Sequence, residues 1–148
     1  MNIDTSIRQF LTGQSAKAYE IFGAHADHQY GKDGIVFRVY APYAANMELV
    51  GDFNNWEGWQ MNRRPDGVWT IFCDNIPWGA LYKYRTTTNS GEKIDRADPF
   101  AFYSELRPGS ASRVWDIDHY YWRDGDWMEY RRQDYKNYTR PMSIYEVH

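Results

Sequence analysis

The sequence predicts an all-β sandwich with a short helical leader before it and an extended linker after it. Short runs that alternate apolar and polar residues recur from Gly34 onward, and turns rich in glycine and proline separate them. Aromatic residues make up 18% of the 148 residues, which is enough ring surface to fill the core between two sheets. After residue 118 the alternation stops, and aromatic and charged residues are interleaved instead.

The composition excludes several classes of protein. A hydrophobic content of 43% suffices for one domain with a core, and a formal net charge of -3 gives no basic surface for a phosphate backbone, so nucleic acid is not an expected partner. No apolar run approaches the roughly 20 residues that cross a bilayer, and the N-terminus lacks a secretory signal, so no membrane partner is expected. The single cysteine, Cys73, excludes an internal disulfide framework. These features predict a cytoplasmic protein.

Residues 1–30 are expected to form a helical leader. Asp4 and Thr5 are candidate N-caps of a short amphipathic helix that stops at Gly13. Its apolar residues follow at helical spacing and are Ile7, Phe10 and Leu11. A second apolar stretch over residues 16–22 predicts one or two further helical turns before the next glycine.

Residues 31–118 are expected to form the sandwich. The alternating runs cover residues 35–40, 47–50, 68–73, 80–88, 92–95 and 112–117. Short strands at this spacing, separated by turns such as Pro65-Asp66-Gly67 and Asn89-Ser90-Gly91, are typical of an immunoglobulin-like β-sandwich with roughly seven antiparallel strands.

The tail has two parts. Residues 119–142 carry seven aromatic rings interleaved with charges and are expected to be an extended linker that lies over a surface. Residues 143–148 begin to alternate like a strand, yet the sequence stops at His148, which predicts a chain cut from a longer protein.

No arrangement typical of a catalytic centre is present. A nucleophilic Ser or Cys needs a base, an orienting acid and oxyanion donors, and Cys73 instead alternates with Ile71 like a core residue. Glycoside chemistry needs two carboxyl groups about 5 Å apart. The candidate carboxylates lie in turn-like contexts, where Asx turns and solvated surfaces explain them, and they are Asp52, Asp66, Asp95 and Asp98. No catalytic residue is predicted.

His25, Asp27 and His28 form a cluster of residue types that bind zinc. No distant Cys or His completes a ligand set, and residues in a loop after a glycine more often serve as turn and capping groups. The sequence therefore predicts neither a metal site nor a cofactor.

Trp56 is the most informative aromatic residue. It follows the polar loop formed by residues 51–55, where an exposed ring would present an apolar face beside amide groups. Pyranose rings are amphipathic, because their C–H faces pack on aromatic planes while their hydroxyls bond to amide and ammonium groups. Trp56, Asn55 and Lys83 have this chemistry if their strands are neighbours. The competing interpretation, which composition alone favours, is that Trp56 packs under the loop as part of the core.

Five motifs occur in a fixed order along the predicted sandwich. They are GIVFRVYAP at residues 34–42, ELVGDFNNW at 48–56, GALYKY at 79–84, ADPF at 97–100 and LRPGSAS at 106–112. Together these motifs resemble the family-48 carbohydrate-binding modules. Their order and spacing look most like the copy at the front of bacterial glycogen branching enzymes, and similar motifs before and after extend the resemblance over almost the whole chain.

The resemblance implies a larger parent enzyme. Such a parent cuts an α-1,4-glucan, holds the fragment as a covalent glycosyl-enzyme and transfers it to a 6-hydroxyl with a retaining carboxylate pair in a barrel domain. Residues 143–148 resemble the first barrel strand, and the catalytic carboxylates belong to motifs beyond His148. The resemblance therefore implies that this chain is non-catalytic and that its partners are the parent's own barrel and an α-1,4-glucan or maltooligosaccharide.

The glycan-binding residues that the resemblance implies are Trp56, Lys83, Asn55 and Ser110. Glycogen-sensing relatives stack sugar on a second Trp as well, but the matching position lies near Lys93, which has no ring, and a contact Asn of those relatives is replaced by Ser112. Losing one of two stacking rings removes about 1 to 3 kcal/mol, by analogy with stacked bases. Binding is therefore expected to be weak.

Two alternative functions remain open at the level of sequence. The domain could be purely structural, docking on the barrel to shape its entrance without a sugar site. It could also be a stand-alone module that targets glycogen, although the barrel-like ending argues against this interpretation.

Overall fold

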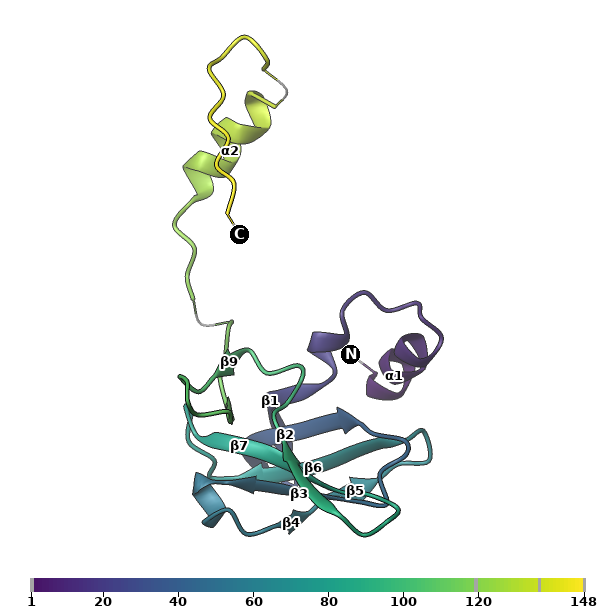
Figure 1. The fold of residues 1–148 in the computed structure, drawn as a ribbon. Coiled ribbons are helices and arrows are strands. Elements are labelled where there is room, and N and C mark those ends of the chain that lie inside the picture. The colour runs from purple at the N-terminus through teal and green to yellow at the C-terminus, as the bar shows by residue number, and fades with distance from the viewer. Residues whose placement is uncertain (1, 119, 136, 148) are drawn as a thin grey trace. The chain divides into compact units, whose positions relative to one another are not determined.

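Two antiparallel β-sheets, packed face to face, form most of the first of two units (Figure 1). The computed structural model describes residues 2–118, 120–135 and 137–147. The chain divides into the unit Met1–Ile117, which contains both sheets, and the unit Asp118–His148. The expected immunoglobulin-like β-sandwich is confirmed.

The sheets are built from ten strands in the described residues. The four-stranded sheet has the order β1-β2-β6-β5, and the six-stranded sheet has the order β4-β3-β7-β10-β9 with β8 also paired to β7. In chain order the strands are β1 (Gly23–Gln29), β2 (Lys32–Tyr40), β3 (Asn46–Gly51), β4 (Trp59–Gln60), β5 (Asn62–Arg63), β6 (Val68–Asp74), β7 (Leu81–Thr87), β8 (Lys93–Arg96), β9 (Tyr103–Ser104) and β10 (Ser112–Arg113).

The core lies between the two sheets and follows the alternation in the sequence. On β2, Phe37 is fully buried, and on β7 both Tyr82 and Tyr84 are buried while Lys83 between them is not. Phe37 and Tyr82 meet edge to face with ring centroids 5.0 Å apart, so the two sheets interlock through aromatic contacts. The residues that alternate with this set on β7 consequently face away from the core.

Strand β1 differs from the expectation of a helical leader over residues 1–30. It pairs with β2 from Gly23↔Arg38 to Gln29↔Lys32, which leaves a two-residue loop of Tyr30 and Gly31. Both loop residues have positive φ, 54° and 75°, as the tight hairpin turns that match strand twist require. The usual sequence signal for such a turn is Asn-Gly or Asp-Gly, so Tyr-Gly did not predict it.

The helices of the leader are present in its first part. Helix α1 (Ile3–Leu11) is capped by Asn2 rather than by Asp4 or Thr5, because the Asn2 side chain accepts hydrogen bonds from the backbone N–H groups of both residues. A 3-10 turn, η1 (Ala18–Glu20), follows. Asp4 instead pairs with Arg64, its carboxylate 2.7 Å from the guanidinium, and so ties α1 to the sandwich.

A second apolar cluster holds the leader against the four-stranded sheet. It contains the fully buried Ile7, Ile21, Phe22 and Val68, with Phe10 and Phe100 packed against them. The Phe22 ring lies 4.7 Å from Phe10 and 5.4 Å from Phe100, measured between centroids. This cluster covers the outer face of the sheet at Val68, on β6.

The unit Asp118–His148 contains helix α2 (Gly125–Gln133), where the sequence predicted an extended linker over residues 119–142. None of its helical residues is buried within the described part of the chain. Residues 143–147 adopt neither helix nor strand, although the sequence alternates there like a strand. Among the described helices, none has the length and apolar character needed to cross a membrane.

Replacing Phe22 with alanine should lower the free energy of unfolding by about 3 to 5 kcal/mol, because it opens a cavity in the cluster that joins the leader to the sheet. Chemical denaturation measures the loss, and hydrogen exchange of the α1 amides should accelerate with it. Tyr43→Ala is the matched control, since Tyr43 is 88% exposed and its loss should change stability by less than about 0.5 kcal/mol. Equal effects of the two substitutions would show that the cluster does not anchor the leader.

Candidate functional site

The outer face of the six-stranded sheet brings several of the predicted residues together. Because side chains alternate across a strand, Lys83 and Arg85 of β7 point away from the core that receives Tyr82 and Tyr84. β3 lies beside β7 with Val50 opposite Lys83 and Glu48 opposite Arg85. The loop that follows β3 carries Trp56.

The loop after β3 is built around a buried asparagine. Asn54, in the 3-10 turn η2 (Asp52–Asn54), accepts a hydrogen bond from Gly51 N at 2.8 Å and donates to Leu49 O at 3.1 Å. Asn55 and Trp56 follow with positive φ values of 54° and 60°. Trp56 N then donates to Gly51 O at 2.8 Å, so the chain turns back over the end of β3.

Phe53 takes the core position that composition alone assigned to Trp56. Its half-buried ring packs against the core, 6.3 Å from Phe37 and 5.4 Å from Trp59 between centroids. The Trp56 side chain is 37% exposed and so keeps part of its surface in water. Two consecutive left-handed residues turn the chain between these rings, which separates an inward phenyl from an indole that reaches solvent.

Lys83 and Ser110, predicted from sequence, are in direct contact. The Lys83 ammonium donates a hydrogen bond to Ser110 Oγ at 2.9 Å. Ser110 is exposed on the connection between β9 and β10, and Asn55 is exposed beside Trp56. The two groups place a cation and a hydroxyl on the same face as the Trp56 loop. Ser112, the other serine of this segment, is instead buried.

Arg85 and Asp95 belong to this face, and sequence reasoning did not assign them to it. The Arg85 guanidinium makes two hydrogen bonds to the Asp95 carboxylate, at 2.7 and 2.9 Å, and a longer one of 3.4 Å to Trp56 O. The hydrogen bond from Arg85 holds the pKa of Asp95 below its usual value. Arg85 thus links β8 to the Trp56 loop. The period-two spacing of residues 83 and 85 was the signal that could have found it.

Lys93, near which the resemblance placed the missing second ring, forms an ion pair with Glu48 of 3.0 Å. Glu48 also lies against Gly58, where the lack of a side chain leaves room for the Glu48 carboxylate. This end of the face is therefore closed by a charge pair rather than opened by an aromatic plane.

Asp98 corrects the expectation that all four candidate carboxylates occupy turns or solvated surfaces. It is buried, and its carboxylate accepts hydrogen bonds from Tyr82 OH at 2.7 Å, Tyr84 OH at 3.1 Å and Phe100 N at 2.8 Å. Asp98 N donates to Ser112 Oγ at 2.8 Å. Burial raises the pKa of Asp98 above 3.8, although the hydrogen bonds it accepts act in the opposite direction.

Asp66 serves a turn, as expected, whereas Asp52, exposed in η2, bonds to a strand that is distant in the sequence. Asp52 accepts a hydrogen bond from Leu81 N at 3.1 Å, and Asp66 accepts one from Val68 N at 3.1 Å. Cys73 is buried, and burial raises the pKa of its thiol to about 12, which agrees with a core residue.

The residues His25, Asp27 and His28 do not converge. His25 Nε2 lies 2.9 Å from Phe22 O, and His28 Nδ1 lies 2.7 Å from the Asp33 carboxylate. The Asp27 carboxylate accepts hydrogen bonds from Gln29 and Arg38. Over the residues that the structure describes, no group of three metal-ligating side chains is found.

Known proteins similar to this chain agree with this architecture. The family model of carbohydrate-binding module 48, also described as the isoamylase N-terminal domain, matches residues 21–101. The 1,4-alpha-glucan branching enzyme GlgB of Geobacillus stearothermophilus is 44% identical over 148 residues, which cover 98% of this chain and 23% of that protein. The enzyme of the same name from Thermosynechococcus vestitus is 41% identical over 147 residues, covering 98% of this chain and 19% of that protein. The chain thus spans about a fifth of the length of these curated relatives.

Solved structures share the fold. Klebsiella pneumoniae pullulanase complexed with maltotriose has a TM-score of 0.51 and 28% identity, covering 70% of this chain and 10% of that chain. Pullulanase complexed with maltotetraose from Anoxybacillus sp. LM18-11 has a TM-score of 0.57 and covers 70% of this chain and 16% of that chain. The Anoxybacillus protein is 24% identical, so this second likeness shows the fold alone.

Asp98→Asn should change how stability depends on pH. Because the pKa of Asp98 is raised in the folded state, the folded chain binds more protons than the unfolded chain between pH 3.8 and the raised pKa. The free energy of unfolding of the native chain minus that of Asp98→Asn should therefore fall as pH rises through this window, and the difference should be constant above it. Urea denaturation of both proteins at a series of pH values measures the difference. A relative stability that rises with pH would mean that the hydrogen bonds to the carboxylate outweigh its desolvation.

Proposed function

This chain belongs to the carbohydrate-binding module 48 family, and on that premise we propose that it binds α-1,4-glucan chains as a non-catalytic accessory domain. The observation that carries the proposal is that the exposed Trp56 lies in a loop that Arg85 of β7 contacts. The hydrogen-bonded pair of Lys83 and Ser110 lies on the same face of β7 as Arg85. An indole plane offers the apolar contact that a pyranose ring needs. An ammonium group, a hydroxyl and the Asn55 amide offer hydrogen-bond partners for its hydroxyls.

The proposed site is small, and weak binding follows from its construction. In the proposal Trp56 supplies the stacking ring, and at the other end of the face the Lys93 ammonium is paired with Glu48. The backbone of Trp56 is held in advance by the hydrogen bond to Gly51 and the contact with Arg85, so the loop needs little ordering when a sugar binds. We therefore assign Arg85 the role of a positioning residue and Trp56 that of the contact residue.

The parent protein is part of the same proposal. The curated relatives are 1,4-alpha-glucan branching enzymes of which this chain matches about a fifth. In the proposal the parent forms α-1,6 branches in glycogen by retaining glucan transfer in the cytoplasm. Residues 119–142 connect the module to a catalytic barrel that begins within residues 143–148. The barrel would then be the second partner of this chain, beside the glucan.

Trp56→Ala should weaken binding of maltoheptaose at least about tenfold, because it removes the stacking surface. A titration followed by NMR signals of the backbone amides measures the dissociation constant in the native chain and in the variant. Trp127→Ala is the matched control, since Trp127 is 60% exposed in the other unit and its loss should leave affinity unchanged. If the loop signals of the native chain do not move at millimolar maltoheptaose, the domain acts as a structural element rather than a glycan-binding one.

Lys83→Met should weaken maltoheptaose binding about threefold to tenfold, since it removes the ammonium donor and keeps the length of the side chain. Because the ligand is neutral, affinity of the native chain should depend little on salt concentration. Isothermal titration at low and high salt tests both expectations. Unchanged affinity in Lys83→Met would exclude Lys83 from the contact surface while leaving Trp56 in place.

A further inference from the structure

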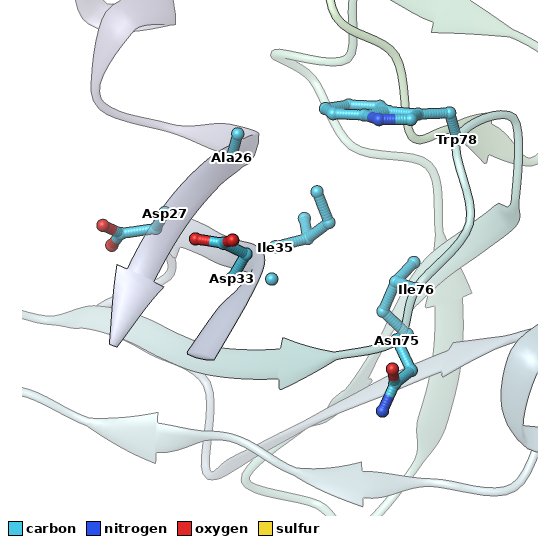
Figure 2. A pocket seen from close by; sticks show the side chains of 8 residues that line it. Ala26, Asp27, Asp33, Ile35, Asn75, Ile76 and Trp78 are labelled. Atoms are coloured by element: carbon cyan, nitrogen blue, oxygen red, sulfur yellow. The ribbon is translucent and has the colours of Figure 1, made fainter. Parts of the chain in front are cut away.

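A pocket lies beside the β1–β2 hairpin, in a part of the sandwich that the Trp56 face does not include (Figure 2). Its volume is about 540 Å³, within the range of small-molecule sites. It is bounded by the hairpin on one side and by the connection from β6 to β7 on the other. The lining residues are Ala26, Asp27, Asp33, Gly34, Ile35, Asn75, Ile76 and Trp78.

Trp78 forms an aromatic wall of the pocket. It lies in the short connection between β6 and β7 and is 49% exposed. Figure 2 shows its indole extending from that connection toward the hairpin, above the side chain of Ile35. Ile35 is buried and Ile76 is partly buried, so the floor opposite the indole is apolar. A flat ligand with an apolar face fits between such surfaces.

The polar groups lie at the sides of this apolar slot. The Asp33 carboxylate lies on the hairpin side of the pocket, and the Asn75 carboxamide lies on the side opposite Trp78 (Figure 2). Asn75 has a φ of 60°, a left-handed conformation that turns the chain directly after β6. The Asp27 carboxylate points away from the slot and accepts hydrogen bonds from Gln29 and Arg38 instead.

The charges around the pocket favour a neutral ligand. None of the described lining residues is Lys or Arg, so the pocket has no group that would hold a phosphate or an acidic peptide. The Asp27 carboxylate lies 3.4 Å from the Arg38 guanidinium, and the Asp33 carboxylate is hydrogen-bonded to His28. A ligand with an apolar face and several hydroxyls satisfies the indole, the isoleucines and the polar side groups together.

We infer that this pocket is a second glucan subsite, which takes a glucosyl unit of an α-glucan between Trp78 and Ile35 with Asp33 accepting a sugar hydroxyl. The inference rests on the proposed function, because it takes an α-glucan as the ligand of the domain. The Trp78 connection leads into β7, whose first residue, Leu81, donates from its backbone N–H to Asp52 of η2 at 3.1 Å.

The test follows the indole N–H and isoleucine methyl NMR signals of the 148-residue chain during titration with maltoheptaose. Trp78→Ala should abolish the shifts at Ile35 and Ile76 and leave the shifts around Trp56 unchanged. Trp56→Ala should abolish the shifts around residue 56 and leave the shifts at Ile35 and Ile76 unchanged. In Trp78→Ala the affinity at the pocket should fall at least about fivefold. Trp78→Phe keeps a ring and so guards against loss of the fold, and its affinity at the pocket should fall less.

Asp33→Asn separates a sugar from a cation as the occupant. An amide still accepts a hydrogen bond from a hydroxyl, so maltoheptaose shifts at Ile35 should weaken less than about threefold. The inference would be overturned in favour of a cationic partner by the following result. A lysine-rich peptide shifts the Trp78 signal, this shift is lost in Asp33→Asn, and maltoheptaose does not displace the peptide.

The outcomes distinguish this inference from the proposed function. Shifts at Trp56 without shifts at Trp78, Ile35 and Ile76 would overturn the second subsite and leave the proposed function standing. Shifts at the pocket alone would support the subsite and remove Trp56 from the glycan-binding surface. An absence of shifts at both places in millimolar maltoheptaose would overturn both.

Discussion

The buried carboxylate of Asp98 is the interaction on which the exposed face of the six-stranded sheet depends. It joins the hydroxyls of Tyr82 and Tyr84 to the backbone of the segment after β8, and Asp98 N bonds to Ser112 on β10. These contacts tie β7, β10 and the segment after β8 to one another on the inner side of the sheet. Lys83 lies between the two tyrosines and Ser110 lies two residues before Ser112, so the groups that meet on the outer face are held in register by bonds on the inner face.

The loop after β3 shows the same division between an inner and an outer side. Asn54 is buried and satisfies the backbone of Gly51 and Leu49, which allows the next two residues to adopt left-handed conformations. Such conformations are uncommon for side chains as large as tryptophan, and the hydrogen bonds at Gly51 and Arg85 offset their cost. Strain of this kind is expected where a side chain must be presented in one orientation.

Strands with regular alternation were predictable from the sequence. The runs at residues 35–40, 47–50, 68–73 and 80–88 are close to β2, β3, β6 and β7, because one side of each strand is apolar and the other is not. β1 was missed because Ala24 and Ala26 give little contrast with their neighbours and Tyr30 is an unusual residue for a left-handed turn. Helix α2 was missed because its aromatic and charged residues show no apolar stripe, and none of its helical residues is buried.

The site was partly predictable for similar reasons. Lys83 and Trp56 could be proposed from the sequence because their residue types suit a sugar. The pairing of Arg85 with Asp95 could not, because it depends on a strand order that the sequence does not state. Asp98 was misplaced because a carboxylate before proline is usually a turn residue. Its burial is made tolerable by the hydrogen bonds it accepts from the two tyrosine hydroxyls and from Phe100 N.

The packing of α1 bears on where this module begins as a folding unit. The family match starts at residue 21, whereas Ile7 and Phe10 of α1 pack into the cluster that holds Phe22 and Val68. A fragment trimmed to the matched residues would keep most of both sheets, yet it would expose an apolar patch on the outer face of the four-stranded sheet. A fragment that begins at the homology boundary should therefore aggregate, and α1 is better regarded as part of the folded module than as a segment that precedes it.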